Sequence, residues 1–209
     1  MKNTFIAICA FLFASLAHAG LIPNGSFESG FTSWDTNNNL ASVVSSYTAS
    51  NGSTPVSMYA TDGNQFAILQ ANKPATSIWS SAFTVGIGDV LLLDSFYDSK
   101  DYPPFNDKGL FWLKMVSGNT TILSGLLGSV GTVGSYGLSG WTTHSFTMTT
   151  SGNVKLMLSS TNGGDNNLDS VLGIDNVRVN RVPEPGTLAL ASLAGVGLAG
   201  FTRRKKKTA

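Results

Sequence analysis

The sequence predicts an all-β protein, with one antiparallel β-sandwich over residues 20–182, an N-terminal signal peptide helix and a C-terminal transmembrane helix. Three observations predict this. Gly, Ser, Thr and Asn make up 74 of the 163 residues of the middle section, which favours strands and turns over helices. Short apolar runs in that section alternate with a period of two, as strands do. Both ends instead carry continuous apolar runs next to basic residues.

The N-terminal segment has the three parts of a secretory signal peptide. Met1–Asn3 contains a lysine, Phe5–Leu16 is an apolar run, and Ala17–Ala19 has the small residues of a cleavage site. We therefore expect the secretion machinery to remove residues 1–19, with an uncleaved membrane anchor as the alternative. Cys9, the only cysteine, lies in the apolar run. The exported chain would then lack disulfides, thiol catalysis and cysteine-bound zinc.

The middle section contains runs of strand length bounded by Gly, Asn, Asp or Pro. The clearest alternating runs lie at 79–85, 91–96, 110–115, 144–148, 154–158 and 175–179. In one continuous strand Trp79 would lie on the same face as the apolar Phe83, which predicts that Trp79 belongs to the core. Every second position of the last run holds Asp175, Val177 and Val179, which predicts one shared face for these three side chains. We expect eight to ten strands in an antiparallel sandwich.

Glycine recurs at every third position from Gly125 to Gly140. Collagen has this period, but the other positions here lack proline and the triplets are few. The stretch predicts a flexible or extended surface loop. It is no phosphate-binding loop, because no Gly-Lys-Ser/Thr follows it.

The middle section is acidic. Residues 20–182 contain 7 basic and 11 acidic side chains, a net charge of −4, and ten of the eleven acids are aspartate. Aspartate favours turns and metal sites over helix surfaces. A protein holds nucleic acid mainly through basic side chains on the phosphates, so we expect no nucleic-acid partner.

The C-terminal segment combines three features. Pro183-Glu184-Pro185 precedes an apolar run from Thr187 to Thr202, which is followed by the basic cluster Arg203, Arg204, Lys205, Lys206 and Lys207. Sixteen helical residues span about 24 Å, slightly less than the hydrocarbon core of a membrane. The positive charges would hold the far end in the cytoplasm. A plain tail anchor is the alternative interpretation.

These features of residues 183–209 resemble the PEP-CTERM sorting signal, also named the ice-binding protein C-terminal domain. The resemblance implies a Gram-negative bacterium whose exosortase, a membrane cysteine enzyme, processes the chain near Pro183-Glu184-Pro185. It also implies export of the protein by a producer of exopolysaccharide and biofilm. The tail would be removable, as in a GPI signal.

The middle section has a resemblance of its own. Its opening, Leu21 to Gly30 with Trp34 just after, resembles the start of jelly-roll carbohydrate-binding modules and galactose-binding-like domains. Ile174–Val179 is similar to their last strand. The resemblance implies a jelly roll and a structural Ca²⁺ bound by Glu28, Asp175 and backbone carbonyls around Ser26. The alternative is that Asp175 accepts hydrogen bonds from the backbone of a turn.

Two further acidic loops, at 98–107 and 162–169, offer oxygen ligands of the kind that calcium prefers. Neither has the spacing of an EF-hand. Solvated turns are the alternative for both loops.

The sequence gives little support for catalysis. His144 is the only histidine in residues 20–182, and Glu28 is the only glutamate there. No Gly-x-Ser-x-Gly motif or Cys-His pair is present. We expect His144 to be a core or edge residue, and we expect no catalytic residues and no enzyme activity.

Aromatic side chains are the best candidates for ligand contacts. Tyr97, Tyr102 and Phe105 lie at or in the first acidic loop, and Trp112 alternates with the apolar side chains of its run. Sugars stack their C–H faces on aromatic rings, so we assign these four residues to a glycan-binding surface. The alternative is that each ring packs in the core.

Together these features predict an exported, non-catalytic cell-surface or extracellular-matrix protein that binds exopolysaccharide. The inner membrane would hold the chain through its C-terminal helix before processing. A purely structural matrix or adhesion protein is the main alternative, and a glycan-active enzyme is a weaker one.

Overall fold

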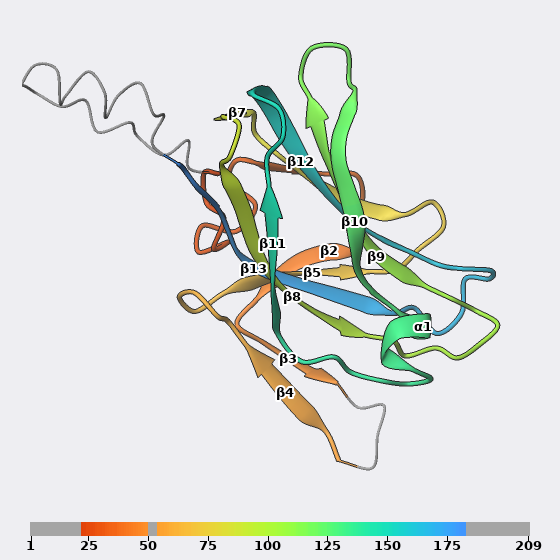
Figure 1. Ribbon diagram of the computed structural model, residues 1–209. Coiled ribbons are helices and arrows are strands. Elements are labelled where there is room, and N and C mark those ends of the chain that lie inside the picture. The colour runs from red at the N-terminus through yellow and green to blue at the C-terminus, as the bar shows by residue number, and fades with distance from the viewer. Residues whose placement is uncertain (1–21, 50–53, 183–209) are drawn as a thin grey trace, which may run out of the picture. The chain divides into compact units, whose positions relative to one another are not determined.

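The computed structural model describes residues 22–49 and 54–182, which are folded into two packed antiparallel sheets and a small hairpin (Figure 1). Residues 20–182 form one compact unit. The first sheet has the order β1-β6-β12-β9-β10, with β7 also paired to β12, and the second has the order β11-β8-β13-β5-β2. The predicted all-β antiparallel sandwich is therefore confirmed. The expected terminal helices lie outside the described residues.

The elements of the first sheet are β1 (Trp34–Thr36), β6 (Thr76–Ser80), β7 (Phe83–Val85), β9 (Lys108–Met115), β10 (Thr121–Ser129) and β12 (Gly152–Thr161). Those of the second are β2 (Ala41–Val44), β5 (Phe66–Gln70), β8 (Val90–Asp98), β11 (Thr142–Thr147) and β13 (Val171–Asn180). The hairpin pairs β3 (Ser46–Ala49) with β4 (Val56–Tyr59), and the short helix α1 is Val130–Val133.

The main core lies between the two sheets, where alternate residues of each strand meet. On β9, Phe111 and Leu113 are fully buried, whereas Trp112 and Lys114 between and after them are partly exposed. Burying one large apolar side chain contributes about 1.5–3 kcal/mol. Because strand side chains alternate between faces, filling this core forces Trp112 and Lys114 onto the outer face of the first sheet.

A second apolar cluster holds the hairpin against the outside of the second sheet. Phe96 of β8 and Phe66 of β5 are fully buried there. The ring of Trp141 meets Phe96 edge-on at 4.8 Å, and Tyr47 of β3 stacks on Phe96 at 5.5 Å. The second sheet is therefore covered on both faces at this end.

The structure overturns the predicted position of Trp79. Ile78 takes the inward position of β6, so Trp79 points outward and is partly exposed. The run at 79–85 is not one strand, because β6 ends at Ser80 and Phe83 begins β7. The two short strands pair with different parts of β12, and this break resets which side chains face the core.

The structure also overturns the predicted face of Asp175. A β-bulge shifts the register of β13 against β8 between Asp175 and Arg178, and Asn176 has a left-handed backbone with φ of 54°. Ile174 and Val177 therefore both face the core, while Asp175 lies opposite Asp94 on the outer face. A bulge adds one residue to a strand and so changes its alternation.

The glycine stretch is a loop only in its second half, from Gly134 to Gly140. Gly125 and Gly128 lie within β10, and Gly131 lies in α1. A methyl group on Gly128 would lie 2.4 Å from Tyr97 Cβ, far closer than van der Waals contact allows. Glycine therefore lets β10 approach the fully buried Tyr97 ring.

Candidate functional site

The outer face of the first sheet carries a row of large side chains. Trp79 of β6 is the cross-strand partner of Met157 on β12, and Met157 is the partner of Trp112 on β9. All three are partly exposed. Asp35 of β1 and Ser124 of β10 are the polar partners at the two ends of the row. Directly paired side chains lie about 4.5–5.5 Å apart at Cβ, so the row forms a continuous strip across the sheet.

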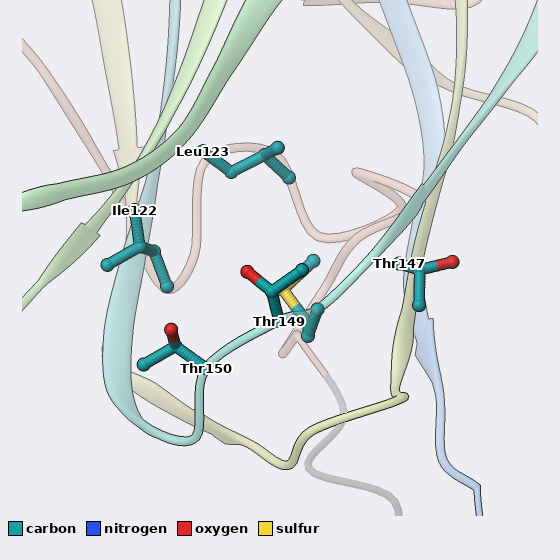
Figure 2. A pocket seen from close by; sticks show the side chains of 6 residues that line it. Ile122, Leu123, Thr147, Thr149 and Thr150 are labelled. Atoms are coloured by element: carbon teal, nitrogen blue, oxygen red, sulfur yellow. The ribbon is translucent and has the colours of Figure 1, made fainter.

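A groove of about 490 Å³ runs beside this strip. Trp79 and Met157 line it together with Lys114 of β9 and Lys155 of β12. The other lining residues are Met115, Val116 and Asn119, at the β9–β10 turn. An apolar and aromatic lining with a few polar groups is typical of ligand sites. In contrast, the cavity in Figure 2 holds only about 50 Å³, between Ile122 and Leu123 of β10 and the threonines that follow β11.

The aromatic residues predicted for a glycan surface separate into three places. Trp112 lies on the outer face of the first sheet. Tyr102 and Phe105 meet edge-on at 5.7 Å in the first acidic loop, where Tyr136 joins them at 5.7 Å from Tyr102. The prediction for Tyr97 is wrong, because its side chain is fully buried between the sheets.

Sequence reasoning missed Trp79, Met157 and Tyr136. The alternation of residues 154–158 does show Lys155 and Met157 facing away from the buried Val154, Leu156 and Leu158. What the sequence does not show is that β12 pairs with both β6 and β9. That pairing brings residues from positions 79, 114 and 157 to one groove.

The two acidic loops are packed against each other. The Gly163 N–H donates to Asp107 Oδ1 at 2.8 Å, and the Asn106 N–H donates to the Gly163 carbonyl at 3.3 Å. Within the second loop, Asn162 Nδ2 donates to Asp169 Oδ1 at 2.8 Å. Burial raises the pKa of Asp101, and the charges of Asp107, Asp165 and Asp169 raise it further. Over residues 22–49 and 54–182, however, no three His, Cys, Asp or Glu side chains form a group that could hold a metal ion.

Glu28 and Asp175 lie at the two ends of one turn, Thr61–Gln65. Asp175 Oδ2 accepts from the N–H groups of Thr61 and Asp62 at 2.7 and 2.9 Å. Glu28 Oε1 accepts from the N–H groups of Asn64 and Gln65, both at 2.7 Å. The two carboxylates therefore brace one turn between them, and we call this arrangement the carboxylate brace.

The carboxylate brace does not fit the predicted calcium ion. Calcium requires six to eight oxygen ligands, whereas the turn directs N–H groups at both carboxylates. Asp175 Oδ1 also accepts from the Asn176 N–H at 2.7 Å. The geometry is that of the alternative, a hydrogen-bonded turn. Calcium binding itself stays a prediction.

His144 has a packing role in the described structure. Its Nε2 forms a hydrogen bond of 2.9 Å with Ser95 Oγ, and its ring stacks on Phe146 with an angle of 5° between the planes. Burial lowers the pKa of His144, although the charge of Asp94 opposes this. The arrangement accounts for this histidine without a catalytic role.

The predicted signal peptide, sorting motif and basic cluster lie outside the described residues. Across the part of the chain that is described, no helix is sufficiently long and apolar to cross a membrane.

Comparisons with solved structures find carbohydrate-binding modules and adhesin domains. The module TmCBM61, in complex with β-1,4-galactotriose, has a TM-score of 0.48 and 16% identity, over 79% of this chain and 100% of the module. The Caldicellulosiruptor saccharolyticus module CBM27-1, in complex with mannohexaose, has a TM-score of 0.49 and 10% identity, over 76% and 94%. The K3 cleaved adhesin domain of Lys-gingipain from Porphyromonas gingivalis has a TM-score of 0.47 and 12% identity, over 77% and 98%.

No curated protein matches the sequence. One known family of sequence segments does match the end of the compact unit and the segment that follows it. Residues 181–207 are a PEP-CTERM protein-sorting motif, and the resemblance of this segment is thereby confirmed.

Proposed function

We propose that this protein is exported and binds glycans through the outer face of its first sheet, without catalysing a reaction on them. The row of Trp79, Met157 and Trp112 beside the groove carries the proposal. The indole rings of this strip offer the C–H face of a sugar ring a large contact at little cost in conformational entropy. Polar groups at the edge of the groove can then bind hydroxyl groups.

The sorting motif supports the route by which the protein would reach its site of action. An exosortase would process the chain near Pro183-Glu184-Pro185 while the inner membrane holds it through residues 187–202. The product would be a cell-surface or matrix protein. Exopolysaccharide of the producing cell is the natural candidate for its ligand.

The test is a pull-down of the full-length protein on the exopolysaccharide of its own host. Trp79→Ala and Trp112→Ala should each reduce the bound fraction severalfold, because each removes a stacking surface from the same strip. Tyr59→Ala is the matched control, since Tyr59 is a 64% exposed aromatic residue on β4, outside the first sheet.

If both tryptophan variants bind the exopolysaccharide as well as the unmutated protein does, this surface is not the binding site. No retention of any of the four proteins would favour the alternative, a structural matrix or adhesion protein without glycan binding.

A further inference from the structure

The groove contains a pair of lysines that the stability of the sheet does not explain. Lys114 of β9 and Lys155 of β12 are direct cross-strand partners. Both lie on the outer face, because the neighbouring Leu113, Val154 and Leu156 are buried in the core. Like charges directly opposite each other on antiparallel strands destabilise the pair. The pairing therefore lowers the stability of the sheet rather than adding to it.

The described surroundings do not neutralise this pair. Lys114 has Thr121, a neutral residue, as its partner on the other side, on β10. Five of the eleven acidic side chains of residues 20–182 lie in the loops at 98–107 and 162–169, and Asp35, the cross-strand partner of Trp79, lies on the same outer face as the groove. In a middle section with a net charge of −4, the groove is thus a local positive site.

The two lysines line the groove together with apolar side chains. The same groove is lined by Trp79 and Met157, so a ligand that fills it must offer an apolar face and negative charge close together. A uronic acid residue does both, with its C–H face and its carboxylate. Nucleic acid fits less well, because it needs an extended row of basic side chains for its phosphates.

We propose that Lys114 and Lys155 make this groove selective for acidic glycans, whose carboxylates they bind while the sugar rings lie on Trp79 and Met157. This inference depends on the proposed glycan-binding function and specifies the class of glycan. It also predicts a salt dependence, because charges at a surface are screened over about 10 Å at 0.1 M salt and about 3 Å at 1 M.

The experiment compares two ligands that differ only at C6 of each sugar, an oligogalacturonate and the same oligosaccharide with its carboxylates reduced to neutral alcohols. Binding of each to the purified full-length protein is measured by calorimetry at low and at high salt. We expect the acidic ligand to bind roughly tenfold more tightly at low salt, as two exposed ion pairs would produce. This preference should shrink towards zero at 1 M salt.

The variants assign the preference to the lysines. Lys114→Gln with Lys155→Gln should abolish the preference, so that the double variant binds the acidic and the neutral ligand with equal affinity. Lys108→Gln is the control. Lys108 is an exposed lysine on the same strand and face as Lys114, six residues or roughly 20 Å away, and its loss should leave the preference intact.

The outcomes separate the two proposals. Equal binding of both ligands by the unmutated protein, or a preference that survives in the double variant, overturns the acidic selectivity and leaves glycan binding standing. Binding of neither ligand, together with no retention on the host polysaccharide, overturns both. Circular dichroism of the double variant should show an unchanged fold, because both side chains lie on the outer face.

Discussion

Asp101 is a buried acid that the fold only half satisfies. Its side chain is 1% exposed, and its Oδ1 accepts from the Tyr102 N–H at 2.8 Å. Its Oδ2 is buried without a hydrogen-bond partner among the described residues. Burial is the largest cause of the raised pKa of this carboxyl group. An unpaired charge of this kind costs stability.

The pH dependence of stability follows from the raised pKa of Asp101. The folded state holds the proton more tightly than the unfolded chain does. The carboxyl group therefore favours folding below its unfolded pKa and loses that contribution as the pH rises through its folded pKa. At neutral pH the ionised group opposes folding.

We predict that Asp101→Asn stabilises the protein at neutral pH, by about 1 kcal/mol or ~2–4 °C in Tm. The amide still accepts the Tyr102 hydrogen bond but carries no charge. The gain should shrink at about pH 3.5, below the unfolded pKa of ~3.9. Thermal melts of the two proteins at both pH values measure it. The exposed Asp35→Asn is the control, and an equal gain at both pH values would contradict the prediction.

At the scale of the element, the carboxylate brace connects three distant parts of the chain. Glu28 lies near the start of the described residues, the turn lies at 61–65, and Asp175 lies in the last strand. Gly63 has a φ of 85°, and a methyl group on it would lie 2.5 Å from Glu28 Cδ. Glycine is thus required both by the backbone of the turn and by the closeness of the carboxylate.

We predict that Asp175→Asn lowers the free energy of unfolding by about 1–3 kcal/mol, because the new NH₂ group would face N–H donors of the turn. A domain of this size would lose roughly 2–4 °C of Tm per kcal/mol. The full-length protein and the variant should be melted in EGTA and in millimolar Ca²⁺. The hydrogen-bonded brace predicts the same loss in both buffers.

The calcium prediction gives the opposite result. A bound ion at a hundredfold excess over its Kd would add about 2.7 kcal/mol to the unmutated protein, with Mg²⁺ a poor substitute. Asp175→Asn would then lose most of the difference between the buffers, while Asp35→Asn would keep it. If the unmutated protein melts at a lower temperature in EGTA than in Ca²⁺, the result therefore supports the calcium site.

For most strands, the sequence predicts which side chains face the core. It does not predict where a strand ends early or contains a bulge. The inward residues of β9 and β12 follow from simple alternation, and with them the outward position of Trp112. Trp79 and Asp175 were misplaced because β6 ends at Ser80 and β13 contains a bulge. Both interruptions are stabilised by contacts with distant residues, such as the hydrogen bond that the Thr61 N–H donates to Asp175. Local alternation cannot reveal them.

At the scale of the whole molecule, composition and periodicity predict the sandwich. Strands with one apolar face form sheets with one apolar face, and an all-β chain buries these faces by packing sheet on sheet. The candidate site was harder to predict, since its groove collects residues from β6, β9 and β12. Only Trp112 of the predicted glycan residues lies on that outer face. Tyr97 could not be separated from exposed aromatics by sequence, because β8 is covered on both faces at that end.

The sorting segment gives a prediction for the complete chain. Replacing Arg203, Arg204, Lys205, Lys206 and Lys207 by neutral residues should reduce retention at the inner membrane, because positive residues hold a membrane segment with that end in the cytoplasm. Fractionation of a tagged protein in its host measures both retention and processing. Unchanged location and processing in the neutral variant would contradict the prediction.

The order of strands in the second sheet determines how the molecule responds to mechanical load. The chain reaches residue 182 directly from β13, which is hydrogen-bonded to β8 on one side and to β5 on the other. A pull on the segment beyond residue 182, directed along β13, must shear both ladders at once rather than open one hydrogen bond at a time. A protein tethered at this end would therefore transmit tension through a strand that is hydrogen-bonded on both sides.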